Sequence, residues 1–509
     1  MDTIIVLDFG SQYNQLIARR VRELGVYSEI HPFHYNLENL VQPHIKGIIL
    51  SGGPNSVYDE HAPQITKELF DLQIPILGIC YGMQITQYLF NGTITPTDKR
   101  EYGKSALHIT QSNPLTKGIP SSSTVWMSHG DHVDALAPSF DQLGHTDSCI
   151  AIAKHQTKEI YNLQFHPEVT HTTYGKQLLS NFVLAICKAT PSWRIENYIE
   201  QTIQHIKDVV QKDQVILALS GGVDSSVAAM LIHKAVGKQL TCVFVDTGLL
   251  RKDEGNKVMA LYAEHYNINV VRINAKEAFM KALKDVTDPE EKRKVIGTEF
   301  IRVFEQFKQE HANARFLAQG TIYPDVIESV SIKGPSETIK SHHNVGGLPE
   351  EMNFELLEPL RELFKDEVRQ VGLQLGIPKH MIMRHPFPGP GLGIRILGEI
   401  TDQKVRILQE ADHIFISELY AHDLYDQVSQ AFVVLLPVKS VGVMGDKRTY
   451  EYVASLRSAD TIDFMTATFS HLPYEFLDRV TTRIINEVQG INRVVYDITS
   501  KPPGTIEWE

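Results

Sequence analysis

The sequence predicts an α/β protein, with two successive doubly wound, mostly parallel-sheet domains followed by a small α+β domain. Three observations predict this class. Short apolar runs alternate with helical patterns up to about residue 190, and the same alternation starts again at Val215. A segment rich in proline and glycine near residue 385 then precedes a region of mixed helices and strands. We therefore expect three domains, residues 1–190, 191–384 and 385–509.

The composition excludes several classes of protein. With 42% hydrophobic and 22% charged residues, the 509-residue chain is typical of a globular protein too long for one core. The net charge of −12 argues against a surface devoted to nucleic acid. No apolar run approaches the roughly 20 residues that span a bilayer, and no signal peptide is evident. We expect a cytoplasmic protein with neither nucleic-acid nor membrane partners.

The four cysteines do not form a recognisable framework. Neither a CxxC pair nor a Cys/His spacing of a zinc site is present, and the density is too low for a set of disulfides. Their thiols are therefore expected to be reduced. They are Cys80, Cys149, Cys187 and Cys242.

The first region has the pattern of a layered α/β domain. Thr3–Leu7, Gly47–Leu50 and Ile74–Ile79 are continuous apolar runs, the type of strand that is buried on both faces of a parallel sheet. Ser11–Leu24 places its apolar residues at helical spacing. Further strands are expected at Thr124–Met127 and Ile160–Phe165.

The second region starts after a break at Ala189–Ser192. An amphipathic helix is expected over Trp193–Val210, and a second helix should begin at Val223. The strands expected between and after these helices are Val215–Leu219, Leu240–Val245, Ile268–Ile273 and Arg315–Leu317.

The third region follows Arg384–Gly391, which has three prolines and two glycines in eight residues and cannot form a helix or a central strand. Helical patterns follow at Asp402–Tyr420 and Tyr474–Glu487. Hydrophobic strands are expected at Phe432–Val438 and Arg493–Ile498. These elements fit a small α+β domain.

Cys80 has the sequence context of a nucleophile. It stands between Gly78 and Gly82, after an expected strand and before a helix, which is the arrangement of a nucleophile elbow with sulfur in place of oxygen. The helix N-terminus favours the thiolate. His166 and Glu168 follow another expected strand and supply a base and an acid that orients it. The combination predicts a Cys-His-Glu triad for acyl transfer.

An oxyanion hole is expected beside this triad. The backbone amide of Gly53, in the loop Ser51–Pro54, and the amide of Tyr81 are the candidate donors. Taken singly, a cysteine is usually a small buried hydrophobe and a His-Pro pair is usually a loop. The elbow, the glycine loop and His-x-Glu together favour the catalytic interpretation. The other three cysteines are interpreted as structural.

Residues 1–190 resemble the class I glutamine amidotransferases. The resemblance lies in Asp8–Gln12, Ser51–Pro54, Gly78–Gln84 and Gln164–Glu168. It implies that Cys80 attacks the side-chain amide of glutamine, forms a glutamyl thioester and releases ammonia. The loop Ser128-His129-Gly130-Asp131 looks like the substrate-side loop of that family.

A seven-residue string with the chemistry of a phosphate loop lies between an expected strand and a helix. Its glycines let the backbone approach phosphate, and the helix N-terminus adds N–H donors. A serine and glycine helix cap would explain only part of the string. The acidic residue would repel phosphate unless Mg²⁺ bridges them, so Asp224 is the expected metal ligand. The string is Ser220, Gly221, Gly222, Val223, Asp224, Ser225 and Ser226.

This string resembles the loop of the N-type ATP pyrophosphatases, which cleave ATP between the α- and β-phosphates. The resemblance implies that Val245 and Phe300 line the adenine. Lys340 and Lys365 are candidates to neutralise charge on the pyrophosphate, although a lone lysine is more often a solvated surface charge. The Gly-, Ser- and His-rich stretch Ser331–Gly347 suits a mobile lid.

The tail has specific recognition chemistry. Lys501 and Thr505 can hold a phosphate and Glu507 can accept from a purine N–H, whereas in isolation such a segment is more often a frayed terminus. With the earlier motifs and His385–Leu392, it resembles the glutamine-hydrolysing GMP synthetase family over essentially the whole chain. Gly504 departs from the alanine of many relatives, a small change.

This resemblance implies the substrates XMP, ATP and glutamine, and Mg²⁺ as the metal. Lys501, Ile506 and Glu507 would contact XMP, and the third domain would form a homodimer. XMP would be adenylylated and then aminated to GMP, giving AMP and pyrophosphate.

Two alternatives compete with this interpretation. Another acceptor, as in glutamine-dependent NAD synthetase, would retain both catalytic halves, but the tail and the proline-rich boundary speak against it. A nucleotide-responsive binding protein would not need a nucleophile such as Cys80.

Overall fold

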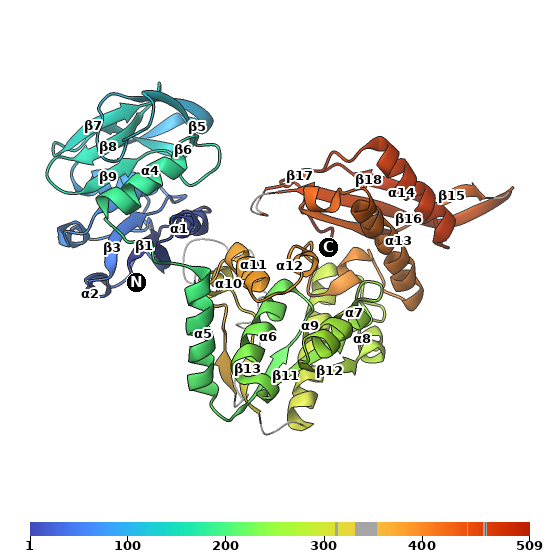
Figure 1. Ribbon diagram of the computed structural model, residues 1–509. Helices are drawn as coiled ribbons and strands as arrows, with labels where there is room; N and C mark the ends of the chain where they lie inside the picture. The colour runs from blue at the N-terminus through green and yellow to red at the C-terminus, as the bar shows by residue number, and fades with distance from the viewer. Residues whose placement is uncertain (311–313, 331–353, 445, 462–463, 465) are drawn as a thin grey trace. The chain divides into compact units, whose positions relative to one another are not determined.

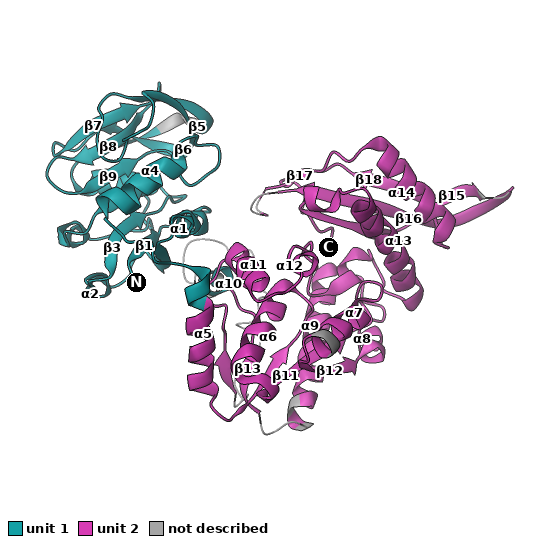
Figure 2. Cartoon of the chain, viewed as in Figure 1, with its two compact units in different colours: residues 1–198, 323–346 teal, residues 199–322, 347–509 magenta. Residues whose placement is uncertain are grey.

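The computed structural model describes residues 1–310, 314–330, 354–444, 446–461, 464 and 466–509, and confirms the expected fold class (Figure 1). The chain forms two compact units (Figure 2). Unit 1 comprises residues 1–198 and 323–346, and unit 2 comprises residues 199–322 and 347–509. The predicted lid at 331–347, including Lys340, lies outside the described residues. The predicted three-domain boundaries stay predictions.

Unit 1 alternates strands and helices in its first half and is mainly strand in its second. Its elements are β1 (Thr3–Asp8), α1 (Asn14–Glu23), β2 (Tyr27–Pro32), α2 (Leu37–Leu40), β3 (Ile45–Leu50), a 3-10 helix (Lys67–Asp71), β4 (Ile76–Ile79), α3 (Tyr81–Leu89), β5 (Thr93–Ile109), β6 (Ser122–Ala135), β7 (Phe140–His145), β8 (Ile150–His155), β9 (Ile160–Leu163), α4 (Gly175–Ser180), a π-helix (Asn181–Ile186) and α10 (Tyr323–Val330).

Among the described residues of unit 1, nine strands form one sheet in the order β2-β1-β3-β4-β9-β8-β7-β5-β6. The first five are parallel neighbours, and the sequence predicts four of them as strands, namely β1, β3, β4 and β9. The fifth, β2, lies at the edge of the sheet, is not a continuous apolar run and is not predicted. The last four join by antiparallel pairing. Of these four strands, only part of β6 is predicted by the sequence. β6 alternates buried and partly exposed residues, so it lacks the continuous apolar run that marks a buried parallel strand. β8 is mostly buried, but its short apolar run is not predicted as a strand.

The parallel half of this sheet brings three chain segments to one edge. Leu50 of β3 is in register with Gly78 of β4, and Ile79 of β4 is in register with Leu163 of β9. The residues that follow these strands therefore emerge side by side, because parallel strands end at the same edge. These residues are the glycine loop, Cys80 and the segment leading to His166.

Unit 2 contains a parallel sheet with helices and a second, largely antiparallel sheet. Its elements are α5 (Ile195–Val210), whose first turn lies in the range of unit 1, β10 (Gln214–Ala218), α6 (Val223–Val236), a 3-10 helix (Gly237–Gln239), β11 (Leu240–Asp246), α7 (Glu254–Met259), a π-helix (Ala260–His265), β12 (Asn269–Asn274), α8 (Lys276–Ala282), α9 (Pro289–Glu310), β13 (Ala314–Ala318), β14 (Glu355–Leu357), α11 (Lys365–Gln374), α12 (Lys379–Ile382), a 3-10 helix (Gly391–Arg395), α13 (Asp402–Ala421), a 3-10 helix (Tyr425–Gln427), β15 (Gln430–Met444), β16 (Lys447–Asp460), β17 (Thr468–Phe469), α14 (Tyr474–Glu487) and β18 (Ile491–Asp497).

The parallel sheet of unit 2 has the order β12-β11-β10-β13-β14. The chain starts at the central strand β10, proceeds to β11 and β12 on one side, and returns to β13 on the other. The point between β10 and β13 is thus a topological switch point, where open α/β sheets bind ligands at the carboxyl ends of their strands. The predicted phosphate loop follows β10 directly.

In the second sheet, β15 and β16 pair antiparallel and β18 adds to β16 in parallel. One cluster of buried hydrophobic residues includes members from both sheets, from Val243 to Leu456, so the proline-rich segment does not divide the hydrophobic core of unit 2. Within the described ranges of the chain, none of the helices combines the length and the apolar character needed to cross a membrane.

His385, in the proline-rich segment, connects this segment to the second sheet. Its ring stacks on Tyr425 with 3.8 Å between ring centroids. Its Nδ1 accepts from the backbone N–H of Ala431 at 3.2 Å, and its Nε2 lies 3.0 Å from the carbonyl oxygen of Tyr425. A ring that accepts at Nδ1 and donates at Nε2 is neutral. Burial is the main cause that lowers the pKa of His385, from 6.5 to about 4.

This arrangement predicts a loss of stability in acid. Between pH 6.5 and 4 the unfolded chain binds a proton that folded His385 does not, so the free energy of unfolding falls as pH falls. The contribution lost between pH 7.5 and 5 is about 2 kcal/mol. In His385→Asn, which cannot titrate, this part of the pH dependence should disappear from urea unfolding midpoints. His413→Asn, at an exposed position on α13, should retain the wild-type dependence. Equal pH dependence in both variants would contradict the prediction.

Candidate active sites

The turn that holds Cys80 is strained in the way a nucleophile elbow requires. Cys80 lies between β4 and α3 and has a positive φ of 52°, a backbone conformation that residues other than glycine rarely adopt. A Cβ on Gly78 would lie 2.6 Å from the carbonyl oxygen of Gly82, and one on Gly82 would collide with the carbonyl oxygen of Leu50. The close packing of this turn therefore excludes any residue larger than glycine at positions 78 and 82.

His166 and Glu168 lie beside Cys80 as a buried pair. The His166 Nδ1 atom is 2.7 Å from Glu168 Oε1, and the two residues are 3% and 1% exposed. Burial lowers the pKa of His166, but the charge of Glu168 and hydrogen bonds with Cys80 and Glu168 outweigh it and raise the pKa to about 10. The structure thus brings together all three predicted triad residues, with an imidazole that holds a proton near the sulfur.

Further groups contact the predicted triad residues, and of these the sequence motifs included only Gln164. The hydroxyl of Thr172 donates to the carbonyl oxygen of His166 at 2.6 Å, and the ring of Tyr13 meets the His166 ring edge-on at 5.2 Å. The side-chain amide of Gln164 lies 3.9 Å from Cys80 Sγ. Only the folded sheet brings these residues together.

The predicted oxyanion donors are also neighbours. Tyr81 is the first residue of α3, so its amide has no acceptor within the helix. A Cβ on Gly53 would lie 3.3 Å from Cγ of Tyr81, and one on Gly52 would lie 3.6 Å from Cβ of Cys80. The glycine loop therefore packs directly against the elbow.

The predicted phosphate loop is closed by its own serines. Ser220 Oγ lies 2.9 Å from Ser225 Oγ and accepts from the amide of Gly222 at 3.2 Å. Ser226 donates to the carbonyl oxygen of Gly222 at 2.6 Å. Gly221 has a positive φ of 71°, and Val223 begins α6. The first turn of α6 thus adjoins a loop of preorganised backbone groups at the switch point.

Asp224 and Lys365 form an ion pair at this loop. The Lys365 Nζ atom lies 2.7 and 2.6 Å from the two carboxylate oxygens of Asp224. A carboxylate next to a phosphate loop fits the ligand chemistry of Mg²⁺ bound together with phosphates. Within the described residues there is no cluster of three or more metal-ligating side chains. Val245, in β11, is buried in the core, and Phe300 of α9 packs against the same core.

Arg384 contacts the phosphate loop, although the sequence indicated only a domain boundary at this position. Its guanidinium donates to the carbonyl oxygen of Gly221 and, at 2.6 Å, to Glu254 Oε1. The position of Arg384 directly before a proline-rich segment is a weak signal that it holds a loop in place. Its distance in sequence from Gly221 and Glu254 gives no indication that these are its partners.

The tail (residues 499–509) is docked rather than frayed. Ile506 is buried with Phe432 and Val434, and Lys501 Nζ donates to the carbonyl oxygen of Phe464 at 2.7 Å. Both carboxylate oxygens of Glu507 are occupied by Arg395, at 3.0 and 2.7 Å, and one also accepts from Gln430 at 2.7 Å. The structure therefore places Glu507 in an ion pair that the sequence did not indicate.

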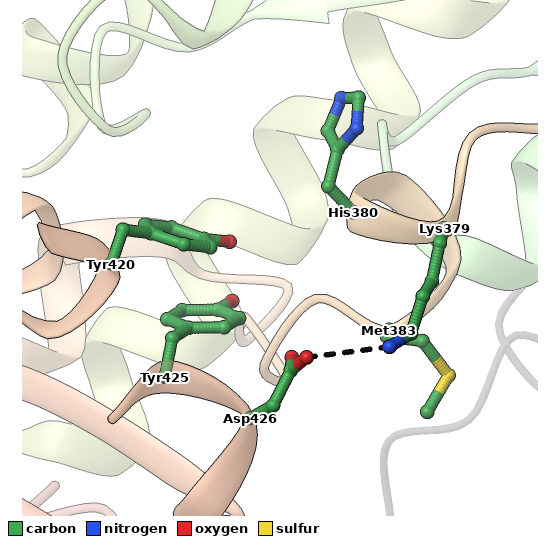
Figure 3. A pocket seen from close by; sticks show the side chains of 6 residues that line it. All are labelled: Lys379, His380, Met383, Tyr420, Tyr425 and Asp426. Atoms are coloured by element: carbon green, nitrogen blue, oxygen red, sulfur yellow. Dashed lines mark hydrogen bonds and ion pairs between the residues drawn. The ribbon is translucent and has the colours of Figure 1, made fainter. Parts of the chain in front are cut away.

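A separate pocket of about 290 Å³ lies in unit 2. Figure 3 shows Tyr420 and Tyr425 with their rings stacked and the ion pair between Lys379 and Asp426 opposite. None of the sequence-predicted site residues lines it. Its lining residues are Lys379, His380, Met383, Tyr420, Tyr425 and Asp426.

Three family models match successive parts of the chain. Residues 5–186 match the class-I glutamine amidotransferase model, and residues 194–321 match the NAD synthase model. Residues 417–508 match the model of the GMP synthase C-terminal domain. The order of these matches agrees with the order of motifs found in the sequence.

Curated relatives match along the full length. The chain is 64% identical over 507 residues to a glutamine-hydrolysing GMP synthase of Fusobacterium nucleatum subsp. nucleatum, with 99% of each chain covered. It is 60% identical over 506 residues to one of Spiroplasma kunkelii, again with 99% of each covered. A solved structure of a putative GMP synthase component from Thermoplasma acidophilum is 33% identical, with a TM-score of 0.32, over 37% of this chain and 95% of that one. The chain belongs to the family of glutamine-hydrolysing GMP synthases, which are glutamine-dependent ligases with a glutaminase domain.

Proposed function

We propose that this chain converts XMP to GMP with ATP and with ammonia released from glutamine at the Cys80 site. The observation that carries the proposal is the strained Cys80 next to the buried, hydrogen-bonded His166–Glu168 pair. A pure nucleotide-binding protein would gain nothing from such a strained and buried arrangement. The loop at Asp224 would supply the chemistry of the second half-reaction, and membership of the family supports XMP as the acceptor.

In the glutaminase half, Cys80 attacks the side-chain amide carbon of glutamine as a thiolate. The amides of Gly53 and Tyr81 stabilise the negative charge that develops on the amide oxygen. His166 gives its proton to the leaving nitrogen, so that ammonia departs and a glutamyl thioester remains. Water, deprotonated by His166, then hydrolyses the thioester to glutamate. Glu168 holds the imidazole in the orientation that both transfers need.

In the synthetase half, the 2-oxygen of XMP attacks the α-phosphate of ATP and pyrophosphate leaves. Ammonia then displaces AMP from carbon 2 and gives GMP. Ser220, the backbone of residues 221–223 and the hydroxyls of Ser225 and Ser226 would bind the pyrophosphate. Bound Mg²⁺ would reduce the negative charge of the phosphates, and Asp224 is the residue that would hold it.

The ion pair between Asp224 and Lys365 fits this assignment. Lys365 and Asp224 neutralise each other's charge across 2.6 Å. On binding of ATP, the ammonium of Lys365 would move from the carboxylate to a phosphate oxygen, and the carboxylate of Asp224 would then be available to hold Mg²⁺. Lys340 is proposed to act on the same phosphates, and Val245 and Phe300 to line the adenine.

The finer assignments of the carboxy-terminal region are proposed on the family resemblance. Lys501, Ile506 and Glu507 would contact XMP, and Glu507 retains one acceptor position beyond the three hydrogen bonds it accepts. Homodimerisation is supported by the outer part of the β15–β16 hairpin, which extends past β18 (Figure 1) and exposes Val441, Val443 and Tyr450. A cytoplasmic location is supported by the four cysteines, all described, none of which forms a disulfide.

Product analysis tests the proposed reaction directly. Incubation with XMP, ATP and Mg²⁺, with either glutamine or ammonium, should give GMP, AMP and pyrophosphate from both nitrogen sources and glutamate only from glutamine. Formation of ADP and phosphate would overturn the pyrophosphatase chemistry. The absence of XMP-dependent turnover would exclude the purine acceptor.

The Cys80→Ala variant should separate the two half-reactions. Glutamine-dependent GMP formation should fall by about 10³-fold or more because the nucleophile is lost, whereas ammonium-dependent formation should be unchanged. Coupled assays with each nitrogen source measure the two rates. Cys149→Ala, at a partly exposed cysteine, is the matched control and should retain both activities. Retained glutamine use in Cys80→Ala would contradict the triad.

The Glu168→Gln variant should change the pH profile of glutamine hydrolysis as well as its rate. The charge of Glu168 opposes burial and raises the pKa of His166, so its removal should lower that pKa and shift the alkaline limb to lower pH. The kcat should fall by about 10²–10⁴-fold. Glu60→Gln, at an exposed position of unit 1, should leave rate and profile unchanged. An unshifted alkaline limb would show that Glu168 does not govern the His166 proton.

The Asp224→Asn variant should have the complementary effect to Cys80→Ala. Loss of the carboxylate should reduce GMP formation from either nitrogen source by about 10²-fold or more. Glutamine hydrolysis measured without nucleotides should persist. The control is Asp208→Asn, an exposed position on α5. Ammonium-dependent synthesis at the wild-type rate in Asp224→Asn would exclude the proposed role of this loop.

A further inference from the structure

Lys292, near the start of α9, is a fully buried lysine to which no part of the proposed chemistry assigns a role. Its side chain has 0% exposure, although lysine is almost never fully buried unless it is paired. A buried ammonium is strongly destabilising without acceptors that replace water. The groups that accept hydrogen bonds from Lys292 therefore indicate its structural role.

Lys292 has two acceptors from distant parts of the chain. Its Nζ donates to the carbonyl oxygen of Ile396 at 2.7 Å and to Oε2 of Glu509. The other carboxylate oxygen of Glu509 accepts from the amide of Gly398 at 3.3 Å, and the backbone oxygen of Glu509 accepts from Arg293. The side chain of Glu509 is only 7% exposed, so this carboxylate is held by the protein rather than by water.

The same short segment also holds Glu507. Arg395, directly before Ile396, is fully buried and binds both carboxylate oxygens of Glu507. Residues 395–398 thus run along the end of the tail, with Arg395 opposite Glu507 and Gly398 opposite Glu509. Lys292 contacts both sides of this pairing, because it binds Ile396 and Glu509 together.

We propose that Lys292 is a positioning residue for XMP binding, which docks the tail through Glu509 so that Glu507 and Lys501 are held in place for the nucleotide. This inference rests on the proposed assignment of XMP to the tail. Lys292 does not touch the substrate. It holds the tail against α9, a helix that also contributes Phe304 to the hydrophobic core of unit 2. The tail residues that are proposed to bind XMP therefore keep a constant position in unit 2.

The experiment uses the full-length chain with Lys292→Met and Glu509→Gln, each folded variant being checked by its thermal unfolding. Lys294→Met is the matched control, since Lys294 is exposed on the same helix. The first readout is hydrogen–deuterium exchange of peptides covering residues 499–509. The second is the KM for XMP, compared with the KM for ATP and with glutamine hydrolysis at the Cys80 site.

Lys292→Met should accelerate exchange in the tail and raise the KM for XMP by about 10-fold or more, because a hydrogen bond between charged groups is lost. The KM for ATP and the glutamine hydrolysis should stay within about 2-fold of wild type. Glu509→Gln should act in the same direction, and the double variant should add little, since the two side chains act through one contact. Lys294→Met should change neither readout.

The outcomes separate the inference from the proposed function. Unchanged exchange of the tail in both variants would overturn the docking role of Lys292. Faster exchange with an unchanged KM for XMP would overturn its role in nucleotide binding. If the wild-type chain forms no GMP from XMP, the proposed function fails, and the exchange data still decide whether Lys292 docks the tail. Should Lys292→Met not fold, Glu509→Gln alone decides both points.

Discussion

Parallel pairing of short apolar strands is the constraint on which both candidate sites depend. Parallel strands bring their carboxyl ends to one edge, so the residues that follow them become neighbours whatever their distance in sequence. In unit 1 this edge brings together the glycine loop, Cys80 and His166. In unit 2 it places the loop at Asp224 against the segment after β13, where a Cβ on Gly320 would lie 2.9 Å from the amide of Ser225. The sites differ in chemistry but arise from the same geometry.

A second theme is that charges removed from water are satisfied by specific partners. His166 is paired with Glu168, Arg395 with Glu507 and Lys292 with Glu509. Pairs of this kind add little net stability, because desolvation offsets their attraction, but breaking one leaves a buried charge uncompensated. Their effect is therefore to fix geometry. In this chain the fixed groups are an imidazole proposed to be catalytic and a tail proposed to bind nucleotide.

Much of the fold could be predicted because its signals are local. Continuous apolar runs identified β1, β3, β4, β10 and β11 to within a residue or two, and helical spacing identified α14 over its full length. The antiparallel strands β5, β7 and β8 were not anticipated. β7 and β8 are only six residues long, so their patterns give little local signal, and they are stabilised by pairing with each other and with β5 and β9.

The sequence by itself determined which residues are the candidates for the chemistry, because an elbow around Cys80 and a loop around Asp224 are short motifs whose backbone conformation depends on adjacent residues. Only the tertiary structure decided what those residues contact. Lys365 meets Asp224 across 141 positions, Arg395 meets Glu507 across 112, and Lys292 meets Glu509 across 217. No local pattern encodes such pairs, since they form only when separate strands and helices pack, and burial then forces each charge to find its partner.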